Sequence, residues 1–182
     1  IDSGIAYDHP DLAPNIWTNL REIAGNGVDD DGNGFVDDVH GWDFLMNDSD
    51  PMDPIDLNPG GNPGHGTHVA GIIAGTGNNG TGVTGVMWTA RLMALKAGGV
   101  NGALSTAAIV SAIHYGIANG ARVINASFSA PDCSQALYDA VSAANAAGVI
   151  LVAAAGNEAS DNDNLPSFPA NFGSPSACDG QQ

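Results

Sequence analysis

One stretch of the sequence decides the fold: Gly64-His65-Gly66-Thr67-His68-Val69-Ala70-Gly71-Ile72-Ile73-Ala74-Gly75. It predicts a helix, because small residues that let other backbone pack close are interleaved with the apolar side chains of Val69, Ile72 and Ile73. A glycine inside a helix costs about 1 kcal/mol relative to alanine, so the glycines here indicate unusually close packing. We therefore expect a helix that is buried on every side, with His65 held at its entrance.

The composition is that of a globular protein with a large excess of acidic residues. Of the 182 residues 43% are hydrophobic, and 20 acidic residues against 4 basic ones give a formal net charge of −16. This charge argues against binding to nucleic acid or to an anionic membrane, and it favours solvation or cation binding. No apolar run reaches the roughly 18 residues that a transmembrane helix needs. We expect no nucleic-acid partner and no membrane partner.

Apolar runs and amphipathic segments alternate along the second half of the chain. The predicted strands cover residues 92–96, 122–128 and 149–154, with shorter ones at 1–5 and 39–44, and the predicted helices cover 104–119 and 134–147. This alternation indicates an α/β fold: a three-layer, doubly wound, mostly parallel sheet with helices on both faces. The run at 149–154 is typical of a strand buried on both faces. Residues 47–63 predict a surface loop leading to His65.

Three motifs together resemble those of the subtilisin-like serine peptidase family. Asp2-Ser3-Gly4 is similar to the family's aspartate motif, and the stretch that opens at Gly64 is similar to its histidine motif. Ala153-Ala154-Ala155-Gly156-Asn157-Glu158 is similar to its oxyanion-asparagine motif. The resemblance implies a subtilisin-like fold, serine endopeptidase activity through an Asp-His-Ser triad, stabilisation by calcium, and secretion from the cell.

The fourth motif of that family, a Gly-Thr-Ser-Met-Ala type sequence that bears the nucleophile, does not occur in the chain. The chain begins at Ile1, inside a predicted strand, and stops before the family would reach that motif. We expect residues 1–182 to be a single, truncated subtilisin-like catalytic domain that is inactive alone. The expected partners are an extended polypeptide substrate and the protein's own propeptide or its missing C-terminal segment.

The resemblance assigns three catalytic roles. His65 would take the proton of the nucleophile, and Asp2 would accept a hydrogen bond from the other ring nitrogen, which fixes the tautomer. Asn157 would donate its side-chain amide to the oxyanion. Asp2 is expected at the carboxyl end of a predicted strand, and Asn157 just past the end of another. Open α/β sheets place their sites at the carboxyl ends of strands.

In that family the substrate lies extended and pairs as a strand with the enzyme. The residues that would bind it here are Gly98, Gly99, Gly102, Ser127, Phe128, Ser129, Ala154, Ala155 and Gly156. The last three would line the pocket for the side chain before the scissile bond. The chain departs from the family at Ser129 and Ala130, where the family has glycines that permit close backbone approach.

An acidic loop has the ligand spacing of a calcium loop. Its candidate ligands alternate along the chain: Asp29, Asp31, Asn33, Phe35 and Asp37. This is the oxygen-ligand spacing of an EF-hand-like loop, although His40 stands where such a loop has its last Glu. We expect a single calcium loop that resembles an insertion of some bacterial subtilases. The alternative is a solvated acidic loop.

A second calcium site is implied by the resemblance alone. The loop at residues 76–85 resembles the family's high-affinity calcium loop, with Asn79 and Asp11 as ligands. The alternative is a plain turn rich in glycine and asparagine. Calcium is the predicted cofactor.

The two cysteines, Cys133 and Cys178, permit at most one disulfide, and no Cys-x-x-Cys metal pair occurs. Two interpretations stay open: small buried or unpaired thiols, or a disulfide, which an extracellular location would favour.

A different class of function is also open. The chain could be a non-catalytic calcium-binding or interaction module, or an inactive remnant, on the same fold. The two classes differ in whether the gene continues past Gln182 into a nucleophile motif.

Overall fold

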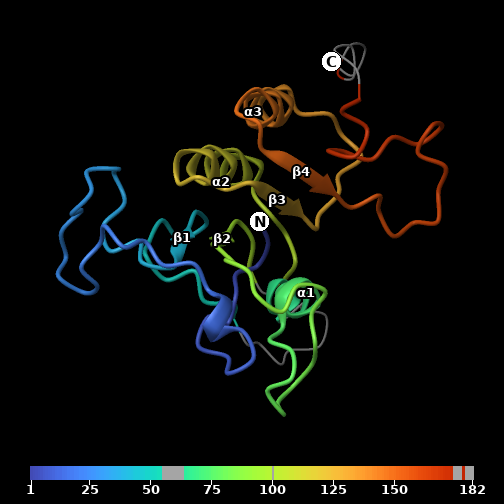
Figure 1. Cartoon of the computed structure of the whole chain (residues 1–182). Helices are drawn as coiled ribbons and strands as arrows, with labels where there is room; N and C mark the ends of the chain where they lie inside the picture. Colours follow the sequence, from blue (N-terminus) through green and yellow to red (C-terminus); the bar gives the residue numbers. More distant parts are fainter. Residues whose placement is uncertain (55–63, 100, 174–177, 179–182) are drawn as a thin grey trace. The chain divides into compact units, whose positions relative to one another are not determined.

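The computed structural model describes residues 1–54, 64–99, 101–173 and 178 (Figure 1). The elements in chain order are η1 (Ala13–Asn15), β1 (Gly41–Asp43), α1 (His65–Ala74), β2 (Ala94–Lys96), α2 (Thr106–Ala118), β3 (Val123–Ala126), α3 (Gln135–Ala146) and β4 (Ile150–Ala153). Strands and helices alternate as the α/β prediction requires. Residues 55–63 of the predicted loop lie outside the described ranges. Within those ranges no helix is both long and apolar enough to cross a membrane.

The chain falls into two compact units, Ile1–Ala108 and Ile109–Gln182. The first unit holds β1, α1 and β2, and the second holds β3, α3 and β4. Among the described residues the strands form two parallel pairs, β1 with β2 and β3 with β4. Each unit therefore has its own parallel strand pair.

In the first unit the start of the chain is held against the edge of the strand pair. A parallel bridge joins Asp2 to Lys96 of β2. The N–H of Asp2 donates to the carbonyl of Leu95 at 3.2 Å, and the N–H of Ala97 donates to the carbonyl of Asp2 at 2.9 Å. The predicted strand at residues 1–5 is thus reduced to one bridge, which places Asp2 beside the end of β2.

Strand β1 begins with a glycine because the neighbouring strand leaves no room for a side chain. Gly41 has a φ of +129°, and a Cβ placed there would overlap the carbonyl oxygen of Ala94, its register partner. At the other end of β1, the Lys96 ammonium lies 2.7 Å from the carboxylate of Asp43, whose side chain is 1% exposed. The same carboxylate accepts the backbone N–H of Leu45 at 2.8 Å. These contacts hold both ends of the strand pair of β1 and β2.

Helix α1 occupies the predicted stretch, but only one of its faces is buried. The buried residues are Gly66, Ala70 and Ala74, whereas Ile72 is 55% exposed. The expectation of a helix buried on every side is therefore wrong for this chain. The small residues form the packed face, and the larger apolar side chains lie to its sides. The apolar cluster that this face joins contains Ile5, Leu12, Ile16, Ala70 and Ala94.

In the second unit β3 and β4 are covered on one face only. Val123 is paired with Ile150, and these side chains are 56% and 62% exposed, while Val152 is 51% exposed. Ile124 and Ala126, which point to the opposite face, are buried. The expectation that residues 149–154 are buried on both faces is therefore wrong: an apolar run does not reveal which of its faces the rest of the chain covers.

The helix ends follow local capping chemistry. Ser134 precedes α3, and its hydroxyl accepts the N–H of Leu137 at 3.4 Å. Ser105 precedes α2, and its hydroxyl accepts the N–H of Ala108 at 3.5 Å. Gly148, with a φ of +75°, follows α3. Both helices lie within the predicted ranges.

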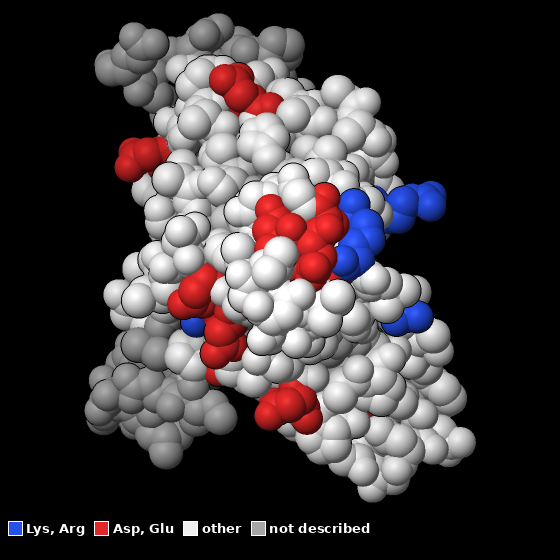
Figure 2. All heavy atoms as spheres, turned by 90° about the vertical axis from the view of Figure 1, so that its left-hand side faces the viewer, with Lys and Arg blue, Asp and Glu red and all other residues white. Residues whose placement is uncertain are grey.

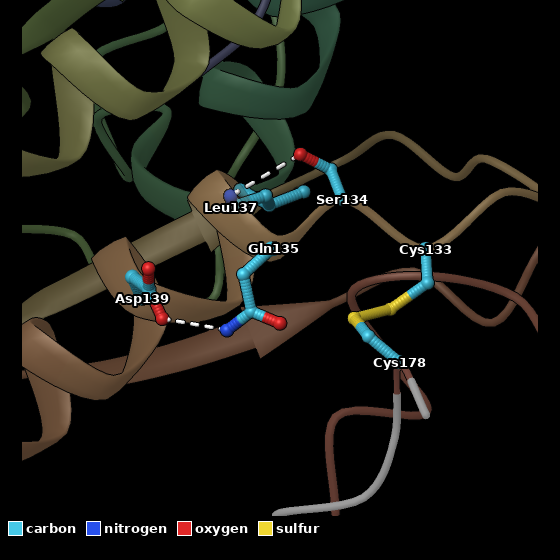
Figure 3. The surroundings of a disulfide bond; sticks show 6 residues. All are labelled: Cys133, Ser134, Gln135, Leu137, Asp139 and Cys178. Atoms are coloured by element: carbon cyan, nitrogen blue, oxygen red, sulfur yellow. Dashed lines mark hydrogen bonds between the residues drawn. A yellow bond between two sulfur atoms is a disulfide. The ribbon is translucent and has the colours of Figure 1, made fainter. Parts of the chain in front are cut away.

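Cys133 and Cys178 form a disulfide with a Cα–Cα separation of 5.4 Å, which decides between the two interpretations (Figure 3). The bond lies next to the start of α3, where Ser134 caps the helix. Nearby, Ala130 and Phe168 exchange two backbone hydrogen bonds, at 2.9 and 2.8 Å. The segment after β3 is therefore joined to the C-terminal part of the chain by the disulfide and by this pair of hydrogen bonds.

We expect Gly41→Ala to lower the free energy of unfolding by about 3 kcal/mol, because it combines an unfavourable φ with a backbone overlap. Urea unfolding followed by circular dichroism measures the change. Gly25→Ala is the matched control, since Gly25 also has a positive φ, +72°, but nothing lies within 4 Å of a Cβ placed there. A cost no greater than that of the control would contradict the close strand approach.

Replacing both Cys133 and Cys178 with serine should destabilise the protein by up to about 4 kcal/mol, the loop-closure value for a separation of 45 residues. The urea midpoint of the double variant is compared with that of the wild type, oxidised and reduced. The reduced wild type should match the variant. Equal midpoints for the variant and the oxidised wild type would show that the bond does not stabilise the fold.

Candidate active site

Asp2 and His65 lie within hydrogen-bond distance, with 2.7 Å between Oδ1 of the carboxylate and Nδ1 of the imidazole. Asp2 is positioned by β2, and His65 is the first residue of α1. The side chain of Asp2 is 11% exposed and that of His65 is 33% exposed. A carboxylate in this position favours a proton on Nδ1, which leaves Nε2 able to accept one.

The two oxygens of the Asp2 carboxylate differ in their contacts. Oδ1 also accepts the backbone N–H of Ser3, at 2.7 Å. Oδ2 is buried and has no hydrogen-bond partner among the residues that the structure describes. The orientation of the carboxylate therefore depends on Oδ1 and on the turn at Ser3.

The glycine after His65 is explained by the backbone that faces it. A Cβ at Gly66 would overlap the carbonyl oxygen of Gly4 and would lie 3.0 Å from the Cβ of Asp2. The N–H of Gly66 donates to the hydroxyl of Ser3 at 3.0 Å. A larger residue at position 66 would separate the turn that carries Asp2 from the helix that carries His65.

Asn157, the third predicted catalytic residue, belongs to the second unit. It is exposed and follows β4, as the sequence predicts. Its backbone N–H donates to the carboxylate of Glu158 at 2.7 Å. A Cβ at Gly156 would overlap the same carboxylate, so Glu158 folds back over this turn. The role of Asn157 toward a substrate stays a prediction.

The predicted substrate residues of the first unit form a tight loop after β2. The N–H of Gly98 points to the carbonyl of Asp2 at 3.3 Å, which places this loop directly beside the aspartate motif. Gly102 donates its N–H to the carbonyl of Gly99 at 3.0 Å, and Gly99 donates to the carbonyl of Ala103 at 3.4 Å. Here the structure brings together the predicted substrate loop and one member of the Asp2–His65 pair.

The predicted substrate residues of the second unit form two segments: Ser127, Phe128, Ser129, and Ala154, Ala155, Gly156. The first segment follows β3 and the second follows β4, so both extend from the carboxyl ends of paired parallel strands. The N–H of Ala154 continues the pairing by donating to the carbonyl of Ala126 at 3.0 Å. This is the edge at which parallel α/β sheets place their ligands.

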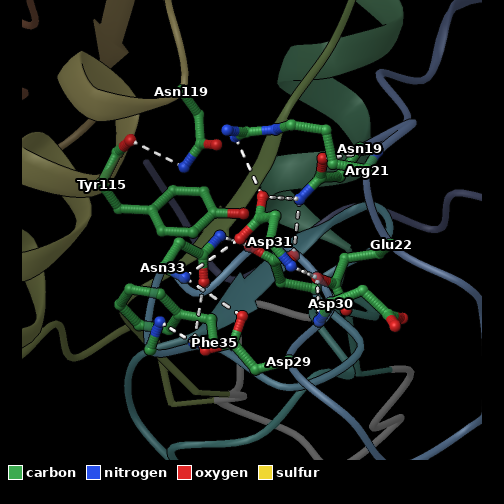
Figure 4. Close-up of polar contacts among 12 residues, drawn as sticks. Asn19, Arg21, Glu22, Asp29, Asp30, Asp31, Asn33, Phe35, Tyr115 and Asn119 are labelled. Carbon is green, nitrogen blue, oxygen red and sulfur yellow. Dashed lines mark hydrogen bonds and ion pairs between the residues drawn. The ribbon is translucent and has the colours of Figure 1, made fainter.

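Three carboxylates of the acidic loop come together in the first unit (Figure 4). One oxygen each of Glu22, Asp29 and Asp31 lies within 4.8 Å of the others. Asp29 and Asp31 are predicted ligands, whereas Glu22 was missed because it lies seven residues before Asp29, outside the spacing of a calcium loop. On the face seen in Figure 2, Asp and Glu side chains gather in patches and Lys and Arg are few.

Glu22 and Asp31 have polar contacts that hold them in this cluster. The carboxylate of Glu22 accepts the N–H groups of Asp30, Asp31 and Asp37, at 3.0, 3.1 and 3.1 Å. Asp31 lies 3.0 Å from the guanidinium of Arg21 and its side chain is 2% exposed. The guanidinium is thus paired with one of the three carboxylates, and an all-oxygen donor set of this charge fits a hard divalent cation such as calcium.

The other predicted ligands of the loop make contacts of their own. The side-chain oxygen of Asn33 accepts the N–H of Phe35 at 2.7 Å, and its amide nitrogen donates to the buried Asp38 at 2.9 Å. The carboxylate of Asp37 accepts the N–H groups of Asn26 and Gly27, at 3.2 and 2.9 Å. Asp37 is thus directed to the beginning of the loop, and its role as a metal ligand stays a prediction.

Asp11 and Asn79, the second predicted calcium site, are in direct contact. The amide nitrogen of Asn79 donates to Asp11 at 2.7 Å, and the N–H of Val83 donates to its other oxygen at 2.8 Å. These bonds, that of Asn79 above all, lower the pKa of Asp11. The ionised carboxylate therefore adds stability at neutral pH, which is lost as the pH falls below the ordinary value of 3.8. A cation here would require Asn79 to present its oxygen, which now accepts the N–H of Thr81 at 3.0 Å.

Comparison with known proteins identifies the family of the chain. The model of the subtilase family matches residues 1–176. Subtilisin-like protease 1 of Plasmodium vivax is 41% identical over 167 residues, which are 91% of this chain and 25% of that protein. Subtilisin DY of Bacillus licheniformis is 35% identical over 96% of this chain and 52% of its own length. The chain thus spans from a quarter to about half the length of these relatives.

Solved structures show the same subtilisin-like α/β fold. A cold-adapted subtilisin-like serine proteinase matches with a TM-score of 0.60 and 27% identity, over 94% of this chain and 49% of that one. The S41 psychrophilic protease matches with a TM-score of 0.66 and 29% identity, over 94% and 48%. The predicted fold is therefore confirmed, and the chain belongs to the subtilase family.

Proposed function

We propose that the chain supplies the general base, its orienting carboxylate and the oxyanion donor of a calcium-stabilised, subtilisin-like serine endopeptidase. The observation that carries the proposal is the 2.7 Å contact between Asp2 and His65. It occurs at the two positions where the sequence resembles the family's aspartate and histidine motifs. The disulfide between Cys133 and Cys178 supports a secreted protein, because such bonds persist in oxidising compartments.

In this mechanism each residue has one chemical task. Nε2 of His65 takes the proton of a serine hydroxyl as the serine oxygen attacks the peptide carbonyl carbon, and the imidazolium then gives that proton to the leaving amine. Asp2 accepts the Nδ1–H hydrogen bond throughout and stabilises the imidazolium without taking its proton. Asn157 donates its side-chain amide to the oxygen that becomes negative in the tetrahedral intermediate.

The proposed substrate is an extended polypeptide that adds as a strand to the segments after β2, β3 and β4. Gly98, Gly99 and Gly102 would face it in the first unit, and residues 127–129 would face it in the second. Residues 154–156 would line the pocket for the side chain before the scissile bond. Ser129 and Ala130 carry side chains where the family has glycines, so we expect pairing at this position to be looser than in other subtilases.

The 182 residues contain no Gly-Thr-Ser-Met sequence, so we propose that this chain alone forms no acyl-enzyme. The acidic cluster of Glu22, Asp29 and Asp31 supports a second candidate function, a non-catalytic calcium-binding or interaction module on the subtilase fold. The two candidates make different predictions for the chain once a nucleophile segment is attached. Only the first predicts that catalysis then appears.

We propose that calcium binds the acidic loop through the carboxylates of Glu22, Asp29 and Asp31. The ion would neutralise the like charges that meet there and so stabilise the folded loop. Further proposed ligands are Asn33, the carbonyl of Phe35, and Asp37. Asp11 and Asn79 remain a second proposed site, which depends on a turn of the Asn79 amide.

A fluorophosphonate serine-hydrolase probe followed by intact mass tests the catalytic proposal. This chain should give no adduct, whereas the same chain extended by a segment with the Gly-Thr-Ser-Met motif should give one stoichiometric adduct and cleave peptides. In the extended chain His65→Ala should lower kcat by about 10^4-fold or more, the upper end of the range for general acid–base catalysis. A folded, extended chain without activity would favour the non-catalytic module.

Calcium should raise the free energy of unfolding by about 2.7 kcal/mol when its concentration is a hundredfold above its Kd. Thermal unfolding with calcium and with a chelator measures this difference. Glu22→Gln should remove most of it, because one of the three clustered carboxylates is lost. Glu158→Gln, the same change in the second unit, should leave it intact. A melting temperature that does not respond to calcium would refute the site.

A further inference from the structure

A buried carboxylate lies behind the Asp2–His65 pair and was not among the predicted site residues. Asp53 belongs to the segment that the sequence predicts as a surface loop, yet it is 2% exposed. It lies 12 residues before His65 in the sequence. Its two oxygens accept hydrogen bonds from the two segments that carry Asp2 and His65.

The first oxygen reaches both segments through one hydroxyl. Ser3 donates its hydroxyl proton to Oδ1 of Asp53 at 2.8 Å, and the Ser3 oxygen accepts the N–H of Gly66 at 3.0 Å. Ser3 is the neighbour of Asp2, and Gly66 is the neighbour of His65. The hydroxyl is thus oriented by Asp53 and bridges the residues that adjoin the two members of the pair.

The second oxygen caps the helix that begins with His65. Oδ2 of Asp53 accepts the N–H of Thr67 at 2.8 Å and its hydroxyl proton at 2.6 Å. The Thr67 oxygen in turn accepts the N–H of Ala6 at 2.9 Å. The N-cap position itself is Gly64, which has no side chain to satisfy these N–H groups. A carboxylate is favourable here because the N-terminus of a helix carries partial positive charge.

The orientation of Asp2 depends on the turn that Asp53 holds. Asp2 Oδ1 accepts the N–H of Ser3, and Oδ2 has no partner among the described residues. A movement of Ser3 would therefore move the carboxylate relative to Nδ1 of His65. We propose that Asp53 is a positioning residue for the Asp2–His65 pair, an inference that rests on the catalytic role proposed for that pair.

The measurement is the exchange with water of the Nδ1–H proton of His65, followed by NMR in the 15N-labelled chain. The signal is assigned by its loss in His65→Gln. Asp53→Asn should make this exchange at least about fivefold faster, the scale of one net hydrogen bond. Asp38→Asn is the matched control, because Asp38 is also buried, at 0%, but accepts the side-chain amides of Asn19 and Asn33 instead of groups beside Asp2 or His65. It should cost stability and leave the exchange rate unchanged.

Three results would overturn the inference. An unchanged exchange rate in Asp53→Asn would remove the link to His65. Equal acceleration in Asp53→Asn and Asp38→Asn would show that Asp53 acts only through general stability. If Asp53→Asn does not fold, Ser3→Ala removes the bridging hydroxyl alone, and an unchanged rate in that variant would overturn the inference as well.

The Asp2→Asn variant tests the proposed function separately, because it removes the carboxylate that would accept the Nδ1–H hydrogen bond. If the wild type shows no slowly exchanging Nδ1–H, or if Asp2→Asn keeps it, the pair itself is absent and both proposals fail. If Asp2→Asn loses the signal while Asp53→Asn retains the wild-type rate, the pair stands and only the role of Asp53 is refuted.

Discussion

The short distance between the turn after Asp2 and the first turn of α1 is the constraint on which the first unit depends. The carbonyl of Gly4 occupies the space that a side chain at position 66 would need, so the helix can start there only with glycine. The same approach lets the hydroxyl of Ser3 bridge to Gly66. This backbone packing brings the side chains of Asp2 and His65 to the same place, where they are in contact at 2.7 Å.

A chain with four basic residues must balance its carboxylates mostly without cationic side chains. Among the residues that the structure describes, the buried carboxylates are those of Asp2, Asp11, Asp38, Asp43 and Asp53. Asp43 is paired with a lysine, whereas Asp11 and Asp53 accept backbone N–H groups together with an amide or hydroxyls. Such partners orient a carboxylate strongly but carry no full positive charge. In the cluster of Glu22, Asp29 and Asp31 an arginine is paired with Asp31, and the negative charge of the other two carboxylates is the basis of the cation site proposed there.

The helices and strands could be predicted because their signals are local. Which of their faces are buried could not be predicted, because that depends on distant parts of the chain. Helix α1 lies within one residue of each end of the predicted stretch, and α3 begins at its serine cap, because these signals act over a few residues. The exposure of Ile72 and Ile150 depends on what covers them, which an apolar pattern does not encode. Asp2 and His65 could be named because their neighbours carry family motifs. Asp53 and Glu22 could not be named from the sequence. Only tertiary contacts bring Asp53 beside Ser3 and Thr67 and Glu22 beside the acidic loop.

The proposed catalytic residues belong to different units, and so they are held in place by different contacts. Asp2, His65 and Asp53 all belong to the first unit, so the geometry of the base is determined by contacts inside that unit. Asn157 follows β4 in the second unit, where the segments after two paired strands lie together. The proposed roles in proton transfer and in oxyanion stabilisation would therefore depend on separate sets of contacts. A substitution that loosens the contacts around Asp2 and His65 therefore need not loosen those around Asn157.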